Sequence, residues 1–282
     1  MFAIYYVLCS FMQTYFMVTE STYNYLEDFL REKQSKGRFA VTLEELKSNF
    51  DLSEKAILQN VFRLKTKNRL AQVRKEFYVI IPPQYINRGM IPSTLFIGDL
   101  MEFLKRDYYV GLLSASALHG AGHQQPMQFQ VMTKKPALRR IRNNKLDINF
   151  FVKSEWREED IIQKKTETGY INVSSPALTA FDLIHYSKKI GGLNRIIPIL
   201  EDLVESIKVS DLNKIAKGQK VPDIQRLGFI MDAMKNEQLA ATLYKRVEGK
   251  PLRVIPISLA HEKREGELNS KWNVILNAEL EF

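Results

Sequence analysis

The sequence predicts an α+β protein: an N-terminal winged helix-turn-helix, then a larger mixed α+β domain with a small sheet and several helices. Three observations predict it. Helical patterns and then a hairpin pattern occupy residues 22–81, strand patterns recur within 128–173, and helical patterns fill most of 176–246. The 282 residues suffice for about two domains. We expect an apolar extension at 1–20, the winged helix-turn-helix at 21–90 and the α+β domain at 91–282.

Composition narrows the class of protein. With 45% hydrophobic and 26% charged residues, the chain is ordinary for a globular protein, which excludes a disordered chain, collagen and a multi-span membrane protein. The single cysteine, Cys9, excludes an internal disulfide framework and a multi-cysteine metal site, and a reducing cytoplasm fits best. The net charge of +9 permits a nucleic-acid or acidic-protein partner.

The first eighteen residues are apolar apart from Ser10, Gln13 and Thr14. They lack the basic flank and cleavage site of a secretory signal, and they are short for a membrane span. Either they form a helix docked on the protein surface, or translation starts at Met12 or Met17. We therefore expect no membrane association.

The winged-helix prediction depends on the order of the elements. A helix is expected over Thr22–Lys33 and ends at Gly37. A capping box at Thr42–Glu45 starts a short second helix that runs to Asn49, and Ser53 is a good N-cap for a third helix over Glu54–Lys67. Two short strands follow around the turn Arg74-Lys75-Glu76, and Pro82-Pro83 ends the second strand.

The third helix has an apolar face and a polar face. We expect Ile57, Val61 and Leu64, joined by Leu58 and Phe62, to face inward. The basic and amide residues lie on the other face or in the hairpin, and from Lys55 to Lys75 no acid interrupts them. Amide and guanidinium groups can read base edges in the major groove, and a basic hairpin can contact phosphate. The predicted DNA-binding residues are Lys55, Gln59, Asn60, Arg63, Thr66, Lys67, Arg74 and Lys75. The alternative is a solvated face, or a winged helix that contacts protein.

The larger domain is expected to begin with two helices, Thr94–Arg106 and Tyr108–Gly120. Predicted strands and then helices follow: strands at Gln128–Thr133, Leu146–Val152 and Gly169–Val173, and helices at 176–189, Leu193–Ile207, Ser210–Ala216, Pro222–Met234 and Asn236–Arg246. The chain closes with strand patterns at Arg253–Ile257 and 271–282.

A second basic run separates the first two of these strands. It contains no acid and either extends a DNA footprint, binds an acidic or nucleotide-binding partner, or is a solvated loop. Its residues are Lys134, Lys135, Arg139, Arg140, Arg142 and Lys145.

Patterns for enzyme chemistry are weak. His119 and His123 have the spacing of a zinc pair on a helix, but Gly120 and Gly122 break that helix; a histidine that caps the helix C-terminus fits better. Asp182 lies three residues before His185 and could orient its imidazole, but the sequence places no Ser or Cys beside them as a nucleophile. The glycines form no phosphate-binding motif, and Glu155, Glu158, Glu159 and Asp160 fit a helix N-terminal turn better than a magnesium site. We predict a non-enzyme without metal or cofactor.

Several motifs in order resemble those of the AbiEi-type antitoxins, the antitoxin half of type IV (abortive-infection) toxin–antitoxin operons. The resemblance covers about residues 20–282. It rests on Tyr78–Tyr85, Arg88-Gly89, Pro92–Met101, Tyr108–Ala121, His123–Pro126, Gly169-Tyr170, Ser175-Pro176, Ala180–Leu183, Gly191–Leu193, Gln225–Gly228 and Trp272–Asn277.

The resemblance implies an N-terminal winged helix that represses the protein's own operon by binding inverted repeats in the promoter. It also implies a C-terminal domain that counteracts a nucleotidyltransferase-like toxin without being an enzyme. It leaves direct toxin contact open, and a homodimer on DNA or two cooperative monomers both fit. From the residues alone, two other hypotheses stand: a protein-interaction module without DNA binding, and a nuclease or nucleotidyltransferase relative.

Overall fold

The computed structural model describes residues 25–122, 126–260 and 265–282 of the chain. The predicted apolar extension at 1–20 and His123 lie outside these ranges. Contacts divide the chain into two units, each described here by itself. The first holds the described residues up to Lys105, with Ile141–Leu146 and Lys165–Tyr170, and the second holds the remainder. The functional boundaries expected near residues 20 and 90 remain predictions.

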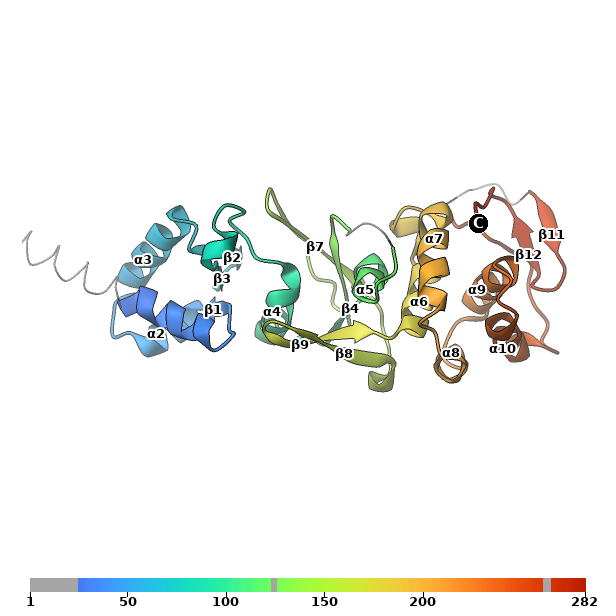
Figure 1. Cartoon of the computed structure of the whole chain (residues 1–282), viewed down its shortest axis with the longest axis horizontal. Coiled ribbons are helices and arrows are strands. Elements are labelled where there is room, and N and C mark those ends of the chain that lie inside the picture. The colour runs from blue at the N-terminus through green and yellow to red at the C-terminus, as the bar shows by residue number, and fades with distance from the viewer. Residues whose placement is uncertain (1–24, 123–125, 261–264) are drawn as a thin grey trace, which may run out of the picture. The chain divides into compact units, whose positions relative to one another are not determined.

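Helices and a small sheet form the first unit (Figure 1). After a helix at 25–35, the elements are β1 (Ala40–Thr42), α2 (Leu43–Asn49), α3 (Glu54–Thr66), β2 (Leu70–Arg74), β3 (Phe77–Ile80), η1 (Pro83–Tyr85), η2 (Ser93–Leu95) and α4 (Ile97–Phe103). The strands pair antiparallel in the order β1-β3-β2. The three helices, the turn and the hairpin thus lie where the sequence predicts them, and β1 is an unpredicted addition.

Local capping explains where α2 and α3 begin. The Thr42 hydroxyl accepts the backbone N–H of Glu45 at 3.1 Å, and the Ser53 hydroxyl accepts that of Ala56 at 3.3 Å. Only half of the predicted capping box forms, because the Glu45 carboxylate pairs with Lys33 instead of reaching back to Thr42. Apolar side chains from the helices and the sheet form one core, which includes Leu30, Leu46, Ile57, Leu64 and Tyr78.

A six-stranded sheet with the order β6-β7-β5-β4-β9-β8 continues the chain. Its strands are β4 (Tyr108–Val110), β5 (Phe129–Thr133), β6 (Ile141–Asn143), β7 (Leu146–Val152), β8 (Ile161–Thr166) and β9 (Gly169–Ser174). The predictions of β5, β7 and β9 are confirmed. The prediction that Tyr108 starts a helix is wrong, because Tyr108–Val110 pairs with both β5 and β9 and the helix begins only after Gly111.

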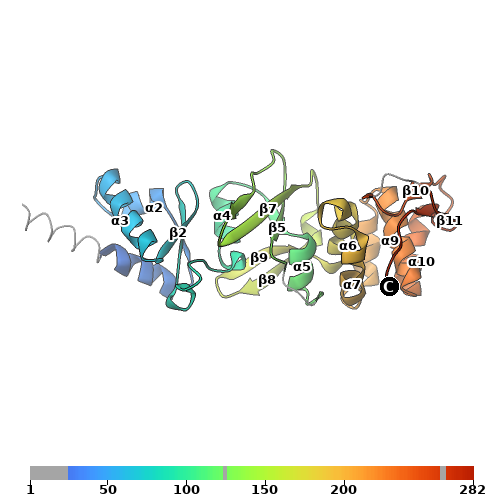
Figure 2. The same ribbon diagram turned by 90° about the horizontal axis from the view of Figure 1, so that it is seen from above.

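Helices of the second unit pack beside this sheet and against one another. They are α5 (Leu112–Leu118), α6 (Pro176–His185), α7 (Leu193–Val204), α8 (Val209–Ala216), α9 (Val221–Ala233) and α10 (Glu237–Val247), with short 3-10 turns η3 (Glu158–Asp160) and η4 (Ser187–Lys189). Figure 2 shows α5 and α6 beside the sheet, and α9 and α10 farther along, next to the closing strands. Those strands are β10 (Ile255–Pro256), β11 (Glu267–Asn269) and β12 (Val274–Leu276).

One continuous apolar core joins these layers, with Tyr109, Phe181 and Trp272 among its fully buried side chains. Among the helices at 25–122, 126–260 and 265–282, none has both the length and the apolar character that crossing a membrane requires.

Candidate nucleic-acid interface

The outward face of α3 is the strongest candidate site. Ile57, Val61 and Leu64 are buried at one, three and zero per cent exposure, which fixes the inward stripe of the helix. Five of the predicted polar residues lie on the exposed side: Lys55, Gln59, Arg63, Thr66 and Lys67. The structure therefore places these five on one solvent-facing surface, as the helical period predicts.

Three predictions on α3 are wrong. Asn60 was expected on the outward face, yet it is only 6% exposed. Leu58 and Phe62 were expected to face inward, yet they are 40% and 68% exposed. The reason is angular: Asn60 lies one turn from Ile57 and from Leu64, so it shares their side, whereas residues 58 and 62 are rotated by about 100° from the buried 57 and 61.

The cations of this surface differ in how they are held. Within the described residues, neither the Lys55 nor the Arg63 side chain has an ion pair or a hydrogen bond, and both are exposed. Lys65, which precedes Thr66 in the sequence and is half-buried, donates from its ammonium group to the Gln72 side-chain oxygen at 2.9 Å. The Thr66 hydroxyl donates to the Phe62 carbonyl oxygen at 3.1 Å, so its methyl group is left to contact a partner.

The β2–β3 hairpin carries the remaining predicted residues. Its turn bends sharply, with Glu76 in the left-handed region at a φ of 64°. The Lys75 side chain is 91% exposed and its nearest acid oxygen, on Glu76, is 3.5 Å away. Arg74 is half-buried and interacts within the chain. Lys75 is therefore the more accessible cation of the hairpin.

The second basic run is divided between the two units. Lys134, Lys135, Arg139 and Arg140 belong to the second unit, whereas Arg142 and Lys145 belong to the first. All six side chains are exposed.

Acids of the second unit already hold part of this charge. The Lys134 ammonium lies 2.8 Å from an Asp107 carboxylate oxygen, and the Arg140 guanidinium pairs through two nitrogens with Asp147. Because Arg140 is fork-paired, it has less charge to offer a partner than the bare sequence indicates.

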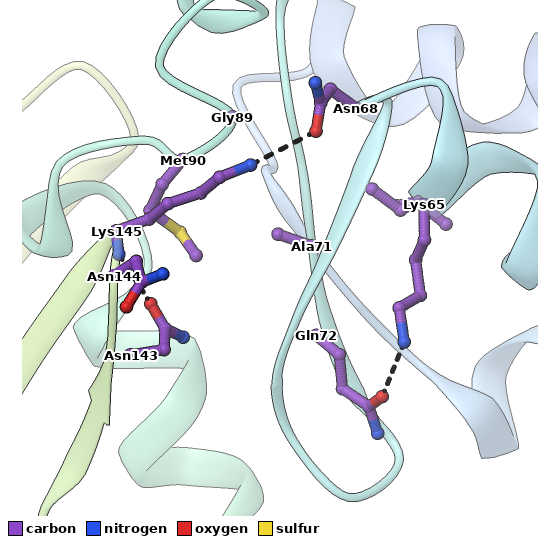
Figure 3. Close-up of a pocket in the computed structure, with 10 residues that line it drawn as sticks. Lys65, Asn68, Ala71, Gln72, Gly89, Met90, Asn143, Asn144 and Lys145 are labelled. Carbon is purple, nitrogen blue, oxygen red and sulfur yellow. Dashed lines mark hydrogen bonds between the residues drawn. The ribbon is translucent and has the colours of Figure 1, made fainter.

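Within the first unit, the turn of the β6–β7 hairpin contributes to a polar pocket of about 390 Å³ (Figure 3). The Lys145 ammonium donates to the Asn68 side-chain oxygen at 3.2 Å. Among the described residues that line the pocket there is no acid, and its polar side chains are Lys65, Asn68, Gln72, Asn143, Asn144 and Lys145. Ammonium and amide groups without a carboxylate suit an anionic or polar ligand.

Gly89 makes this approach possible. A Cβ atom at Gly89 would lie 2.1 Å from the Lys145 nitrogen, and the residue adopts a φ of +60° that favours glycine. The pocket amides were not predicted, because an Asn or Gln in a turn has no sequence signal that separates it from an ordinary loop residue.

The residues considered as catalytic candidates, Asp182 and His185, do not form one site. Asp182 accepts the Tyr109 hydroxyl at 2.7 Å and the Lys153 ammonium at 2.6 Å, so it does not orient His185. His185 instead contacts Asp223 through Nδ1 at 2.7 Å. Burial and the adjacent Asp182 carboxylate raise the pKa of Tyr109 well above its usual value.

The histidine of the HGAGH motif has a structural contact. His119 Nε2 lies 2.7 Å from the Ser174 carbonyl oxygen, to which its N–H donates, and burial lowers the pKa of the ring. The ring thus bonds a strand carbonyl, which corrects the prediction that it caps the end of its own helix. The described ranges hold no cluster of three or more His, Cys, Asp or Glu side chains suited to a metal ion.

The acidic residues predicted to form a turn also have contacts within the chain. Glu158–Asp160 forms a 3-10 turn at the start of β8, and Asp160 accepts both the Nε and an Nη group of Arg157 at 3.0 and 2.7 Å. The carboxylates there therefore serve the turn.

A comparison with protein families found a match that lies mainly in the second unit. Residues 109–233 match the family model described as AbiEi antitoxin C-terminal domain. Over these residues the match confirms the resemblance that the sequence motifs predict.

Solved structures give the fold. The chain is similar to the crystal structure of the RV2827C protein from Mycobacterium tuberculosis, with a TM-score of 0.61 at 14% identity, over 88% of this chain and 89% of that one. At this identity the likeness concerns the fold alone. A search of curated proteins found no match.

Proposed function

From the premise that residues 109–233 form an AbiEi antitoxin C-terminal domain, we propose that the chain is an antitoxin that also binds DNA and represses its own operon. The family match supports the antitoxin role. DNA binding is our proposal for the first unit, which we interpret as a winged helix-turn-helix with α3 as the recognition helix and β2–β3 as the wing.

The element order supports the winged-helix interpretation. Helix 25–35 and α2 precede α3, a tight turn separates α2 from α3, and a two-stranded hairpin follows at once. In a winged helix the last helix enters the major groove and the hairpin lies beside it on the backbone. The exposed α3 face and the exposed Lys75 occupy those two places in the chain order.

One observation carries the proposal: Lys55 and Arg63 stand exposed on α3 without an acid partner among the described residues. An unpaired cation on a folded surface is free to neutralise a phosphate and to release its counterions. Gln59 between them supplies an amide that can pair with an adenine edge.

Titration of the protein against its own promoter DNA, at several salt concentrations, tests this. The double change Arg63→Ala with Lys67→Ala is expected to weaken binding and to reduce the salt slope by about one for each phosphate that is no longer neutralised. Lys188→Ala with Lys217→Ala removes the same charge from exposed positions of the second unit and serves as the control. Equal weakening in both double variants would mean that net charge, and not α3, governs binding; an unaltered shift in the first would refute the recognition-helix assignment.

A second candidate function follows from the exposed Leu58 and Phe62, since apolar side chains on a winged helix also suit a protein partner. That alternative predicts no promoter shift even at low salt, together with loss of toxin rescue when the α3 face is changed. The two outcomes separate the alternatives in a single set of variants.

For the antitoxin half, we propose a nucleotidyltransferase-like toxin as the functional partner, with no enzyme activity in this chain. Co-expression with the toxin gene of the same operon is expected to restore growth. Affinity capture from the same cells shows whether a stable complex forms. Metal-dependent turnover by the purified chain that one carboxylate change abolishes would instead indicate a nuclease or nucleotidyltransferase relative.

We also propose that two copies bind the inverted repeats of the promoter, either as a dimer or as cooperative monomers. The second basic run, above all Arg142 and Lys145 of the first unit, is proposed to extend the phosphate contacts. Lys145→Gln is expected to lower the salt slope by about one without changing sequence preference.

A further inference from the structure

Two apolar side chains stand on the outward face of α3. Phe62 is 68% exposed and Leu58 is 40% exposed, and they lie one helical turn apart. Neither side chain contributes to the apolar core of the first unit. Burial in this fold therefore does not account for them, and a contact outside the fold has to be sought.

The position of Phe62 on the helix is informative. At 100° per residue, Phe62 lies between Leu58 and Lys55, on the side of α3 away from the buried Ile57 and Leu64. Leu58 lies at one edge of the exposed surface, and Lys67 lies at the other edge. If α3 enters the major groove, Phe62 and Leu58 thus lie together on the part of the surface that meets the base edges next to Lys55.

A major groove presents one strongly apolar group, the C5-methyl of thymine; the other groups on the base edges are hydrogen-bond donors and acceptors. An aromatic ring on the groove-facing surface would leave those donors and acceptors unpaired at any other base. Lys55 and Arg63 on the same surface favour a polyanion as its occupant over an apolar protein patch.

We propose that Phe62 and Leu58 are specificity residues that contact thymine methyl groups in the operator. This inference rests on the proposed DNA binding and deepens it: the cations supply affinity for phosphate, and the two apolar side chains select thymine at the positions under the middle of α3.

The test removes the methyl groups and nothing else. Promoter duplexes are prepared with thymine or with uracil at every thymine position, and the dissociation constants for the full chain are compared at one salt concentration. Burial of one methyl group corresponds to about fourfold in affinity, so the uracil duplex is expected to bind at least fourfold more weakly. The Phe62→Ala variant is expected to show a smaller thymine-to-uracil ratio than the wild type, because it lacks one of the two apolar side chains, and Leu58→Ala with Phe62→Ala is expected to bind both duplexes with nearly equal affinity.

Two control variants isolate the effect. Tyr25→Ala removes an aromatic side chain that is 65% exposed on another helix of the same unit, and it should keep the wild-type thymine-to-uracil ratio. Lys75→Gln removes a hairpin cation, and it should weaken both duplexes equally. Thermal melting confirms that Phe62→Ala remains folded, as expected for a side chain so exposed.

The outcomes are distinguishable. Equal wild-type affinity for the two duplexes overturns the inference and leaves the proposed DNA binding intact. An unchanged thymine-to-uracil ratio in Phe62→Ala also overturns it. If both affinities stay at their wild-type values, the methyl effect arises from DNA shape; if both fall by the same factor, Phe62 makes a different contact, such as one with a second copy of this chain. No binding to either duplex refutes the proposed DNA binding itself.

Discussion

Gly228→Ala is expected to destabilise the second unit severely, although alanine is the better helix former. Gly228 lies inside α9, where a Cβ atom would come within 2.2 Å of two ring atoms of Trp272. The indole has little freedom to yield. It is fully buried, its Nε1 donates to Asp232 at 2.5 Å, and the Gln225 amide donates to its backbone carbonyl at 2.7 Å.

The magnitude follows from two opposing effects. Replacing glycine by alanine inside a helix gains about 1 kcal/mol. Displacing the tryptophan ring from its site costs up to about 3–5 kcal/mol, the range for losing a buried tryptophan. The net loss in the free energy of unfolding is therefore about 2–4 kcal/mol, which corresponds to a fall in melting temperature on the order of 10 °C.

Urea denaturation followed by tryptophan fluorescence measures this loss. The chain has two tryptophans, Trp156 and Trp272, and both belong to the second unit, so the signal reports that unit. Gly218→Ala is the matched control, because the nearest atom to its added Cβ would be a carbonyl oxygen at 3.8 Å. Adding Trp272→Phe to Gly228→Ala should recover part of the loss. A Gly228→Ala midpoint within experimental error of the wild type would refute the packing argument.

Three further outcomes are expected. Ser53→Ala should cost about 1 kcal/mol in the unfolding of the first unit, measured by circular dichroism, because the N-cap bond of α3 is removed. Asp182→Asn should cost about 3 kcal/mol in urea denaturation, because the Lys153 ammonium loses its buried counter-charge. Since burial lowers the pKa of His119, protonation opposes folding; stability should therefore fall as the pH drops below about 6.5, and His119→Gln should make that fall shallower in melts between pH 7.5 and 5.

Elements with strong local signals could be predicted from the sequence. The third helix has a serine cap and a regular apolar stripe, and the hairpin after it has β-formers on both sides of a polar turn. The strands β5, β7 and β9 are five to seven residues long, which is long enough for a run of strand-forming residues to be recognised in the sequence. Their positions follow from residue type alone.

The three-residue strands β1, β4 and β6 could not be predicted, because so few residues carry no period. Tyr108–Val110 is the clearest case, since its apolar residues run directly into the apolar helix that begins at Leu112. What makes it a strand is its pairing with β5 and β9, which come from distant parts of the chain. In the same way, β1 is a strand because it pairs antiparallel with β3.

The exposure of Lys55, Arg63 and Lys75 could be predicted, because burying a charge costs free energy wherever the helix packs. Apolar and amide residues follow no such rule. Asn60 is buried because it lies on the packed side of α3, and Phe62 is exposed because no element covers its side among the described residues. Only the packing partners of a helix decide such cases.

The misplaced residues are also the most informative about function. Phenylalanine is a weaker helix former than alanine, and an exposed ring adds little to folding while it invites association. Stability therefore gives no reason for an exposed Phe62 on the surface that carries Lys55 and Arg63. A ligand that presents both negative charge and a small apolar group within a few ångströms accounts for the ring and the cations together, and a thymine-containing major groove has both. On the proposed DNA binding, the departure from the expected apolar stripe would turn a general affinity for nucleic acid into a preference for particular bases.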